Sequence, residues 1–131
     1  QRKLLRERFR KSVTIKPSEV TAISIDQVFL QKTIRKIENH FGDFHFSVEQ
    51  LAEHLNMSIS QLNRKLNALI GQPGGQLMRS LRLQRAADLL KQNSASVSEI
   101  CYKLGFNDHA YFSRAFKKQF GCSPTEYKNG N

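Results

Sequence analysis

Polar side chains gather on one face of the segment from residue 58 to 65. Apolar residues recur there at helical spacing as Ile59, Leu62 and Leu66, so the polar residues between them face away from the apolar stripe. Arginine offers two parallel donors to guanine, and asparagine or glutamine matches the donor and acceptor of adenine. The outward-facing set is Ser60, Gln61, Asn63 and Arg64, of which we expect Asn63 and Arg64 to contribute most. The alternative for each is a solvated surface residue, because the pattern fixes a face and not a set of contacts.

The charge of the chain fits a polyanionic partner. The 131 residues include 21 Lys and Arg against 11 Asp and Glu, a formal charge of +10. Such a charge suits nucleic acid or an anionic membrane surface. No run reaches the ~18 apolar residues of a membrane span, and the start lacks the apolar core of a signal peptide, so we expect a cytoplasmic location. Because the chain begins without Met, we also expect a C-terminal piece of a longer protein.

Helix-start signals recur along the chain. Segments that begin at Ser24, Ser47, Ser58 and Ser96 have the form of a capping box, a Ser followed three residues later by Gln or Glu. The first predicts a helix with a stripe from Leu30 to Phe41 that ends at Gly42. The next two predict a tight helix-turn-helix, with Asn56 in the turn. A longer helix is predicted over 76–91.

The last quarter of the chain repeats this design. The box at Ser96 predicts a short helix, Asp108 is expected to cap the next one, Gly121 ends it, and a final turn starts near Pro124. The helical pair at 47–71 recurs at 96–121, with one extra residue in the second turn. We therefore predict an all-α fold of about seven helices, with two helix-turn-helix subdomains joined by a linker helix. A plain helical bundle is the alternative.

One segment carries a family resemblance. The sequence GFNDHAYFSRAFKK at 105–118, followed by Gly121, Pro124 and Tyr127, resembles the C-terminal signature of AraC/XylS-type transcription regulators, and the likeness covers about 26–128. It implies that the second helix of each subdomain enters the major groove of double-stranded DNA. Two such recognition helices on one rigid spacer would reach successive grooves about 34 Å apart.

The resemblance also places the base contacts. In the first recognition helix they fall on Ser60, Asn63 and Arg64, with Gln61 alongside. In the second they fall on His109, Ala110, Ser113 and Arg114. His109 is the only histidine expected to function, as a donor to a base or phosphate, with a surface role as the alternative. Ala110 offers only a methyl, for thymine. At the position of Arg114 the family also uses structural or backbone contacts, so the second half is expected to recognise sequence less strictly.

Phosphate contacts are expected from basic side chains and from helix N-terminal amides. The basic set is Lys65, Arg79, Arg82, Lys117 and Lys118, and the amides are those at Ser47, Ser58 and Ser96. Asp108 is expected to act as a cap only, because its carboxylate repels phosphate. For the two arginines the alternative is pairing with an acidic residue.

One departure from the family pattern lies at 71–75. Where the family has Ser-Pro after the glycine, this chain has Gly71-Gln72-Pro73-Gly74-Gly75. Because glycine costs a helix about 1 kcal/mol relative to alanine, we expect the linker helix to fray or start late and the junction at 72–77 to be mobile. The expected division is a first subdomain at 24–75, a linker helix at 76–92 and a second subdomain at 93–131.

The segment before the first subdomain resembles a second kind of sequence. LLRERFRKSVTIKPSEVTAISIDQVFLQK is similar to the connector that follows the receiver domain in hybrid two-component systems. Residues 1–23 would then be a basic linker from an upstream receiver domain, in a protein that a sensor could tether to the inner membrane. Expected partners are promoter DNA, the receiver and RNA polymerase. The isolated fragment is expected to be a monomer.

The sequence gives little support to other function classes. No phosphate-binding loop, zinc motif or catalytic triad is present, so we expect neither an enzyme nor a cofactor or metal. Cys101 and Cys122 are interpreted as small apolar residues, and His40, His45 and His54 as surface residues. The competing function is a nonspecific polyanion-binding or membrane-surface module, in which the basic segment 3–10 would take part. Dependence on DNA sequence distinguishes the two.

Overall fold

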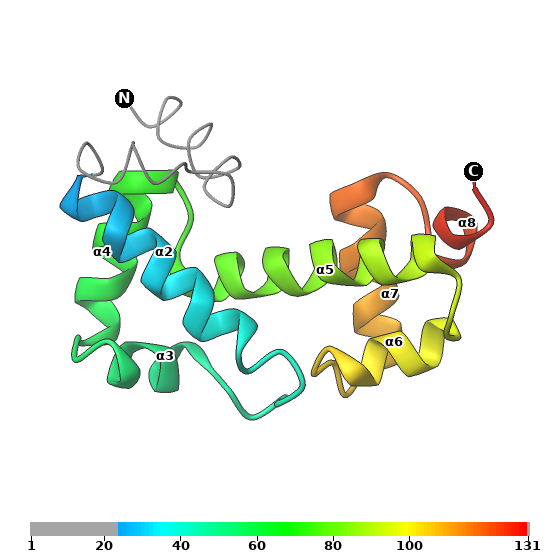
Figure 1. The fold of residues 1–131 in the computed structure, drawn as a ribbon, viewed down its shortest axis with the longest axis horizontal. Coiled ribbons are helices and arrows are strands. Elements are labelled where there is room, and N and C mark those ends of the chain that lie inside the picture. Colours follow the sequence, from blue (N-terminus) through cyan, green and yellow to red (C-terminus); the bar gives the residue numbers. More distant parts are fainter. Residues whose placement is uncertain (1–23, 131) are drawn as a thin grey trace.

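The fold is helical throughout the part of the chain that the structure, a computed structural model, describes, residues 24–130. The predicted basic linker at 1–23 lies outside these residues. Two groups of helices lie at the two ends of the long helix α5, which agrees with the predicted fold class (Figure 1). The helices are α2 (Ile25–Glu38), α3 (Val48–His54), α4 (Ile59–Ile70), α5 (Gly74–Gln92), α6 (Val97–Lys103), α7 (His109–Phe120) and α8 (Pro124–Lys128).

The predicted capping boxes are confirmed. In each box the serine oxygen accepts a hydrogen bond from the N3 backbone N–H, and the N3 side chain accepts one from the serine N–H, at Ser24, Ser47, Ser58 and Ser96. Asp108 caps α7 by accepting the Tyr111 N–H at 3.1 Å. Because such caps are each worth about 1 kcal/mol, they fix where the short helices begin. Asn56 has the predicted left-handed backbone, with a φ of 56°.

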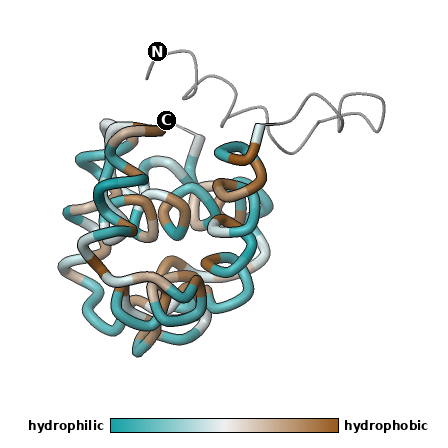
Figure 2. Tube along the Cα trace, turned by 90° about the vertical axis from the view of Figure 1, so that its left-hand side faces the viewer, coloured by the Kyte–Doolittle hydropathy of each residue, from teal (hydrophilic) through white to brown (hydrophobic). Residues whose placement is uncertain are grey.

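Two hydrophobic cores share the linker helix. The first contains Leu77 and Met78 from the start of α5, packed against residues of α2, α3 and α4. The second contains Leu83 and Leu90 from later in α5, packed against α6 and α7. Figure 2 shows apolar and polar residues alternating along the helices, as expected when each helix buries one face. The half-buried side chain of Phe41 packs against both cores.

Three sequence predictions about local structure are wrong. The first helix ends at Glu38 and not at Gly42, because Phe41 lies in the following turn, from which it reaches both cores. Ile59 is 38% exposed, because it is the first residue of α4 and lies before the buried stripe that begins at Leu62. His40 is not a surface residue, because its half-buried ring stacks on Phe46 with 4.0 Å between centroids.

The start of the linker helix also differs from the prediction. Helix α5 begins at Gly74, so the glycine pair is inside the helix and does not delay it. Gly74 is buried, and a Cβ there would lie 2.8 Å from Val48 Cγ2. The glycine is therefore required by close packing between α5 and α3, which outweighs its poor helix propensity.

Candidate nucleic-acid interface

Helix α4 presents two of its predicted base-contacting side chains to solvent. Ser60 and Arg64 are exposed, and neither makes a side-chain hydrogen bond or ion pair within residues 24–130. The apolar side of α4 is anchored in the first core by Leu62 and Leu66, both fully buried. Arg64 is thus held on a rigid helix with all its donors available, as recognition of guanine requires.

The other two polar side chains of α4 are engaged within the protein. Asn63 is half-buried, and its Oδ1 accepts a 2.8 Å hydrogen bond from the Gly74 N–H at the start of α5. Pro73, the N-cap residue of α5, makes no side-chain hydrogen bond to the helix. Asn63 supplies this cap from α4. Gln61 uses its Oε1 in the capping box, where it accepts the Ser58 N–H at 2.9 Å. Each of these amide oxygens thus already accepts one hydrogen bond within the protein, which leaves it one lone pair for adenine.

Helix α7 carries the second predicted set. Ala110 and Arg114 are exposed, whereas Ser113 and His109 are half-buried. The His109 ring lies edge-on to Phe112, with 6.3 Å between centroids. Phe112 and Phe116 anchor the opposite face of α7 in the second core. Like Arg64, the exposed Arg114 has no side-chain partner among the described residues.

Sequence reasoning missed Tyr111 as a part of this surface. It was expected to be available for packing, but its side chain is 39% exposed. Its hydroxyl accepts a long hydrogen bond of 3.5 Å from Arg79 Nη1, which joins α5 to α7. The sequence contained a signal for this position, since Tyr111 precedes the buried Phe112 and so lies off the apolar stripe of α7.

The predicted phosphate-binding lysines differ in their surroundings. Lys117 and Lys118 are exposed near the end of α7. Lys65 is half-buried, and its Nζ lies 4.3 Å from the ring centroid of Phe29 on α2. This cation–π contact holds the Lys65 ammonium against α2 and leaves part of it exposed to solvent.

The N-terminal amides are less available than predicted. The N–H groups of Ser47, Ser58 and Ser96 all donate within their own capping boxes. At Ser96 the acceptor is Glu99, and the hydrogen bonds from the Ser96 backbone and hydroxyl lower the pKa of this carboxyl. Its negative charge at the start of α6 opposes a phosphate. At Ser47 and Ser58 the acceptors are the neutral side chains of Gln50 and Gln61. The first turn of α3 contains Glu49, whereas the first turn of α4 contains no acidic residue, so of these two helix starts only that of α4 keeps its positive dipole uncompensated.

The guanidinium of Arg82 is bonded to the protein backbone. It is half-buried, and its Nη2 donates to the carbonyl oxygens of Asp43 at 2.9 Å and His40 at 3.3 Å. Burial lowers the pKa of Arg82, and the nearby Asp43 carboxylate opposes that shift. This arrangement favours a structural role for Arg82 over the predicted phosphate contact.

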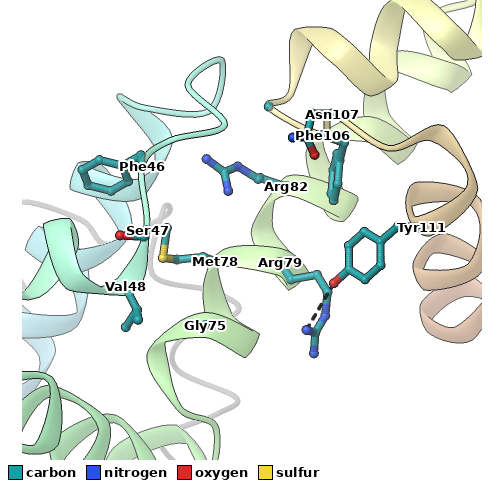
Figure 3. Close-up of a pocket in the computed structure, with 11 residues that line it drawn as sticks. Phe46, Ser47, Val48, Gly75, Met78, Arg79, Arg82, Phe106, Asn107 and Tyr111 are labelled. Atoms are coloured by element: carbon teal, nitrogen blue, oxygen red, sulfur yellow. Dashed lines mark hydrogen bonds between the residues drawn. The ribbon is translucent and has the colours of Figure 1, made fainter.

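An open cleft of about 280 Å³ lies between the two helix groups. Figure 3 shows Arg79 and Arg82 of α5 between Ser47 on one side and Phe106 and Tyr111 on the other. Within residues 24–130 no cluster of three His, Cys, Asp or Glu side chains is placed to hold a metal ion. No helix in this part of the chain is long and apolar enough to cross a bilayer.

Sequence comparison gives a family match. The family described as "Helix-turn-helix domain" matches residues 51–130. The chain is also 34% identical to "Histidine kinase P4" of Formosa agariphila over 125 residues, which are 95% of this chain and 9% of that protein. It is 34% identical to "HTH-type transcriptional activator RhaS" of Escherichia coli over 94 residues, 72% of this chain and 34% of that protein. The chain thus spans about a third or less of the length of these curated relatives.

Solved structures show the same arrangement of helices. The C-terminal domain of AraT, a response regulator from Geobacillus stearothermophilus, is similar with a TM-score of 0.71 and 32% identity, covering 77% of this chain and 84% of that one. The C-terminal domain of the two-component response regulator yesN from Fusobacterium nucleatum has a TM-score of 0.69 and 28% identity, covering 75% of this chain and 95% of that one. With two helix-turn-helix units on one linker helix, the chain belongs to the helix-turn-helix domain family as an AraC-type DNA-binding domain of transcription regulators.

Proposed function

We propose that this domain recognises specific double-stranded DNA by placing α4 and α7 in successive major grooves. The observation that carries the proposal is the equivalence of Arg64 and Arg114, which occupy the same position in the two repeats and are both exposed and unpaired in the described structure. The two helices lie at opposite ends of α5 (Figure 1). At 1.5 Å per residue the 19 residues of α5 span about 28 Å, comparable with one turn of DNA.

The surroundings of each side chain rank the predicted contacts. In α4, Arg64 and Ser60 are the proposed base contacts, and Asn63 and Gln61 rank below them because their amide oxygens already accept hydrogen bonds within the protein. In α7 the proposed set stays as predicted: Arg114, Ser113, His109 and Ala110. Lys117 and Lys118 are the proposed phosphate contacts in the second half. In the first half, the proposed phosphate contacts are the backbone amides of Ile59 and Ser60 at the start of α4. The Ser58 N–H is not among them, because it donates to Gln61 in the capping box.

The wider context is proposed from the relatives. A histidine kinase matches 95% of this chain, and two of the similar solved structures are C-terminal domains of response regulators. We propose that the domain is the output module of a two-component regulator in the cytoplasm, after an upstream receiver, acting on promoters with RNA polymerase. Alone it is proposed to be monomeric, because the stripes of both subdomains are buried internally. A concentration-independent dimer in sedimentation experiments would contradict this last point.

Selection from random duplex DNA tests the proposed function. At a fixed salt concentration, the wild-type domain should enrich two sequence blocks about one helical turn apart. Arg64→Ala should weaken the preference in one block and leave the other. Arg35→Ala on the exposed face of α2 removes the same charge and serves as the control, with both blocks retained. If no block is enriched and binding only fades as salt rises, the domain is a nonspecific polyanion binder.

A further inference from the structure

The turn between α2 and α3, residues 39–45, reaches across to the second subdomain. The backbone carbonyl of Phe41 in this turn lies so close to Gly105 that a Cβ on Gly105 would be 2.5 Å from it. Gly42 is also close, since a Cβ there would lie 3.4 Å from the Lys103 carbonyl oxygen. Gly105 has a φ of +83° and forms the turn that leads into α7. Backbone of the first subdomain thus packs directly on backbone of the second.

Arg82 fixes this junction from the linker helix. Its Nη2 bonds to the carbonyls of His40 and Asp43 and so spans the α2–α3 turn. The same Nη2 lies 3.3 Å from the position of a Cβ on Gly105. The Arg82 guanidinium therefore contacts the turn of one subdomain and lies against the glycine of the other. We call Arg82, Gly105 and the α2–α3 turn the intersubdomain latch.

The linker helix passes from one core to the other at this point. The buried residues of α5 belong to the first core up to Met78 and to the second core from Leu83 onward. Between them, residues 79–82 carry no fully buried side chain. The principal helix–helix contacts lie within one subdomain or involve α5. The half-buried Leu81 packs against the first core, and the latch adds a direct contact between the two halves beside it.

We propose that the intersubdomain latch sets the distance and rotation between α4 and α7, and thereby the number of base pairs that must separate the two blocks of the DNA site. Arg82 is then a positioning residue that acts through the two recognition helices and not through DNA contact. The inference rests on the proposed two-groove function. One added base pair moves a block by about 3.4 Å and rotates it by about 34°, since B-DNA has ~10.5 base pairs per turn. A rigid pair of helices cannot follow that change, whereas a loosened pair can.

The test measures affinity against the separation of the blocks. Fluorescence anisotropy at fixed salt compares the selected site with versions that carry one base pair more or fewer between the blocks. For the wild type we expect a loss of about tenfold per step, the size of a poor contact in one block. For Arg82→Ala we expect a loss of threefold or less and unchanged affinity for a single isolated block. Arg85→Ala, at an exposed position on the same helix, removes the same charge and should keep the wild-type profile.

A glycine pair provides an independent variant. Gly105 and Gly121 both have a φ of +83°, so alanine is strained equally at each, but a Cβ meets the Phe41 carbonyl at Gly105 and open space at Gly121. Gly105→Ala should relax the separation profile, and Gly121→Ala should not. Thermal unfolding confirms that each variant is folded at the assay temperature.

The outcomes separate the two proposals. A wild-type domain that is indifferent to the separation, or that selects one block only, overturns the two-groove function. A wild-type profile that Arg82→Ala and Gly105→Ala leave intact overturns the latch alone. If Arg82→Ala lowers the affinity equally at every separation and keeps the wild-type loss per added or removed base pair, the latch is also overturned. That result would identify Arg82 as a phosphate contact.

Discussion

The side chain of Asn63 on α4 holds the backbone of Gly74 on α5 through a hydrogen bond of 2.8 Å. This bond supplies an N-terminal partner to a helix that has no side-chain cap of its own. It also connects a recognition helix directly to the linker helix. A residue type that suits base recognition is thereby used for the internal architecture of the first subdomain.

Replacing Asn63 should affect stability more than specificity. Asn63→Ala leaves the Gly74 N–H without its partner and should lower the free energy of unfolding by about 1 kcal/mol, as loss of a cap does. Asn63→Asp keeps the acceptor and should cost less. Denaturant unfolding gives the stability, and site selection gives the base preference, which we expect to stay that of the wild type. A changed preference with unchanged stability would show that Asn63 contacts a base.

The two adjacent glycines of α5 should respond in opposite directions to alanine. Gly74→Ala places a Cβ 2.8 Å from Val48 Cγ2 and should destabilise the domain by about 1–3 kcal/mol through overpacking. Gly75→Ala meets nothing within 4 Å and should stabilise it by up to about 1 kcal/mol through helix propensity. Paired thermal melts measure both. Equal effects would show that Gly74 is not closely packed.

Two acidic capping boxes should give the domain a pH-dependent stability. Hydrogen bonds from Ser96 and Ser123 lower the pKa values of Glu99 and Glu126 below their ordinary 4.5. A lowered folded-state pKa stabilises the fold above pH 4.5, and this contribution is lost as the pH falls through the folded-state values. Glu99→Gln with Glu126→Gln keeps both boxes in their neutral form and should flatten the stability profile below about pH 4.5. An unchanged slope in denaturant titrations at several pH values would refute this.

The two cysteines should differ in reactivity. Cys101 is fully buried, and burial, with the nearby Asp108 carboxylate, raises the pKa of its thiol. Because the thiolate is the reactive form, alkylation of Cys101 should require unfolding. Cys122 is half-buried and should react first. Mass spectrometry after a short maleimide pulse, with Cys122→Ser as the control, measures this order, and prompt labelling of that variant would contradict it.

Local signals predicted the helix starts well. A capping box is complete within four residues, so Ser24, Ser47, Ser58 and Ser96 could be identified from the sequence. The outward position of Arg64 followed from the apolar stripe, that of Arg114 from the family resemblance, and the fold class from the repeat. These features depend on neighbours along the chain.

Several of the failures involve partners far away in the sequence. Gly74 begins α5 because Asn63 caps it from another helix. Phe41 continues the apolar periodicity of α2, but it lies in a turn and packs against two cores. Periodicity alone cannot distinguish such a turn residue from one more turn of helix. Arg82 bonds to carbonyls about 40 residues away, and backbone acceptors leave no mark in a sequence. Its interpretation as a phosphate contact used only its charge.

The shared linker helix has a consequence for how such a domain can be divided. Leu77 and Met78 complete the first core, whereas the second core takes its residues from Leu83 onward. A cut in the loop before α5 would leave the first half with a hole where two large side chains belong. The boundary between the two subdomains therefore lies inside the continuous helix α5, at residues 79–82. Exchange of one half between relatives should preserve both cores only when the crossover falls within that single turn.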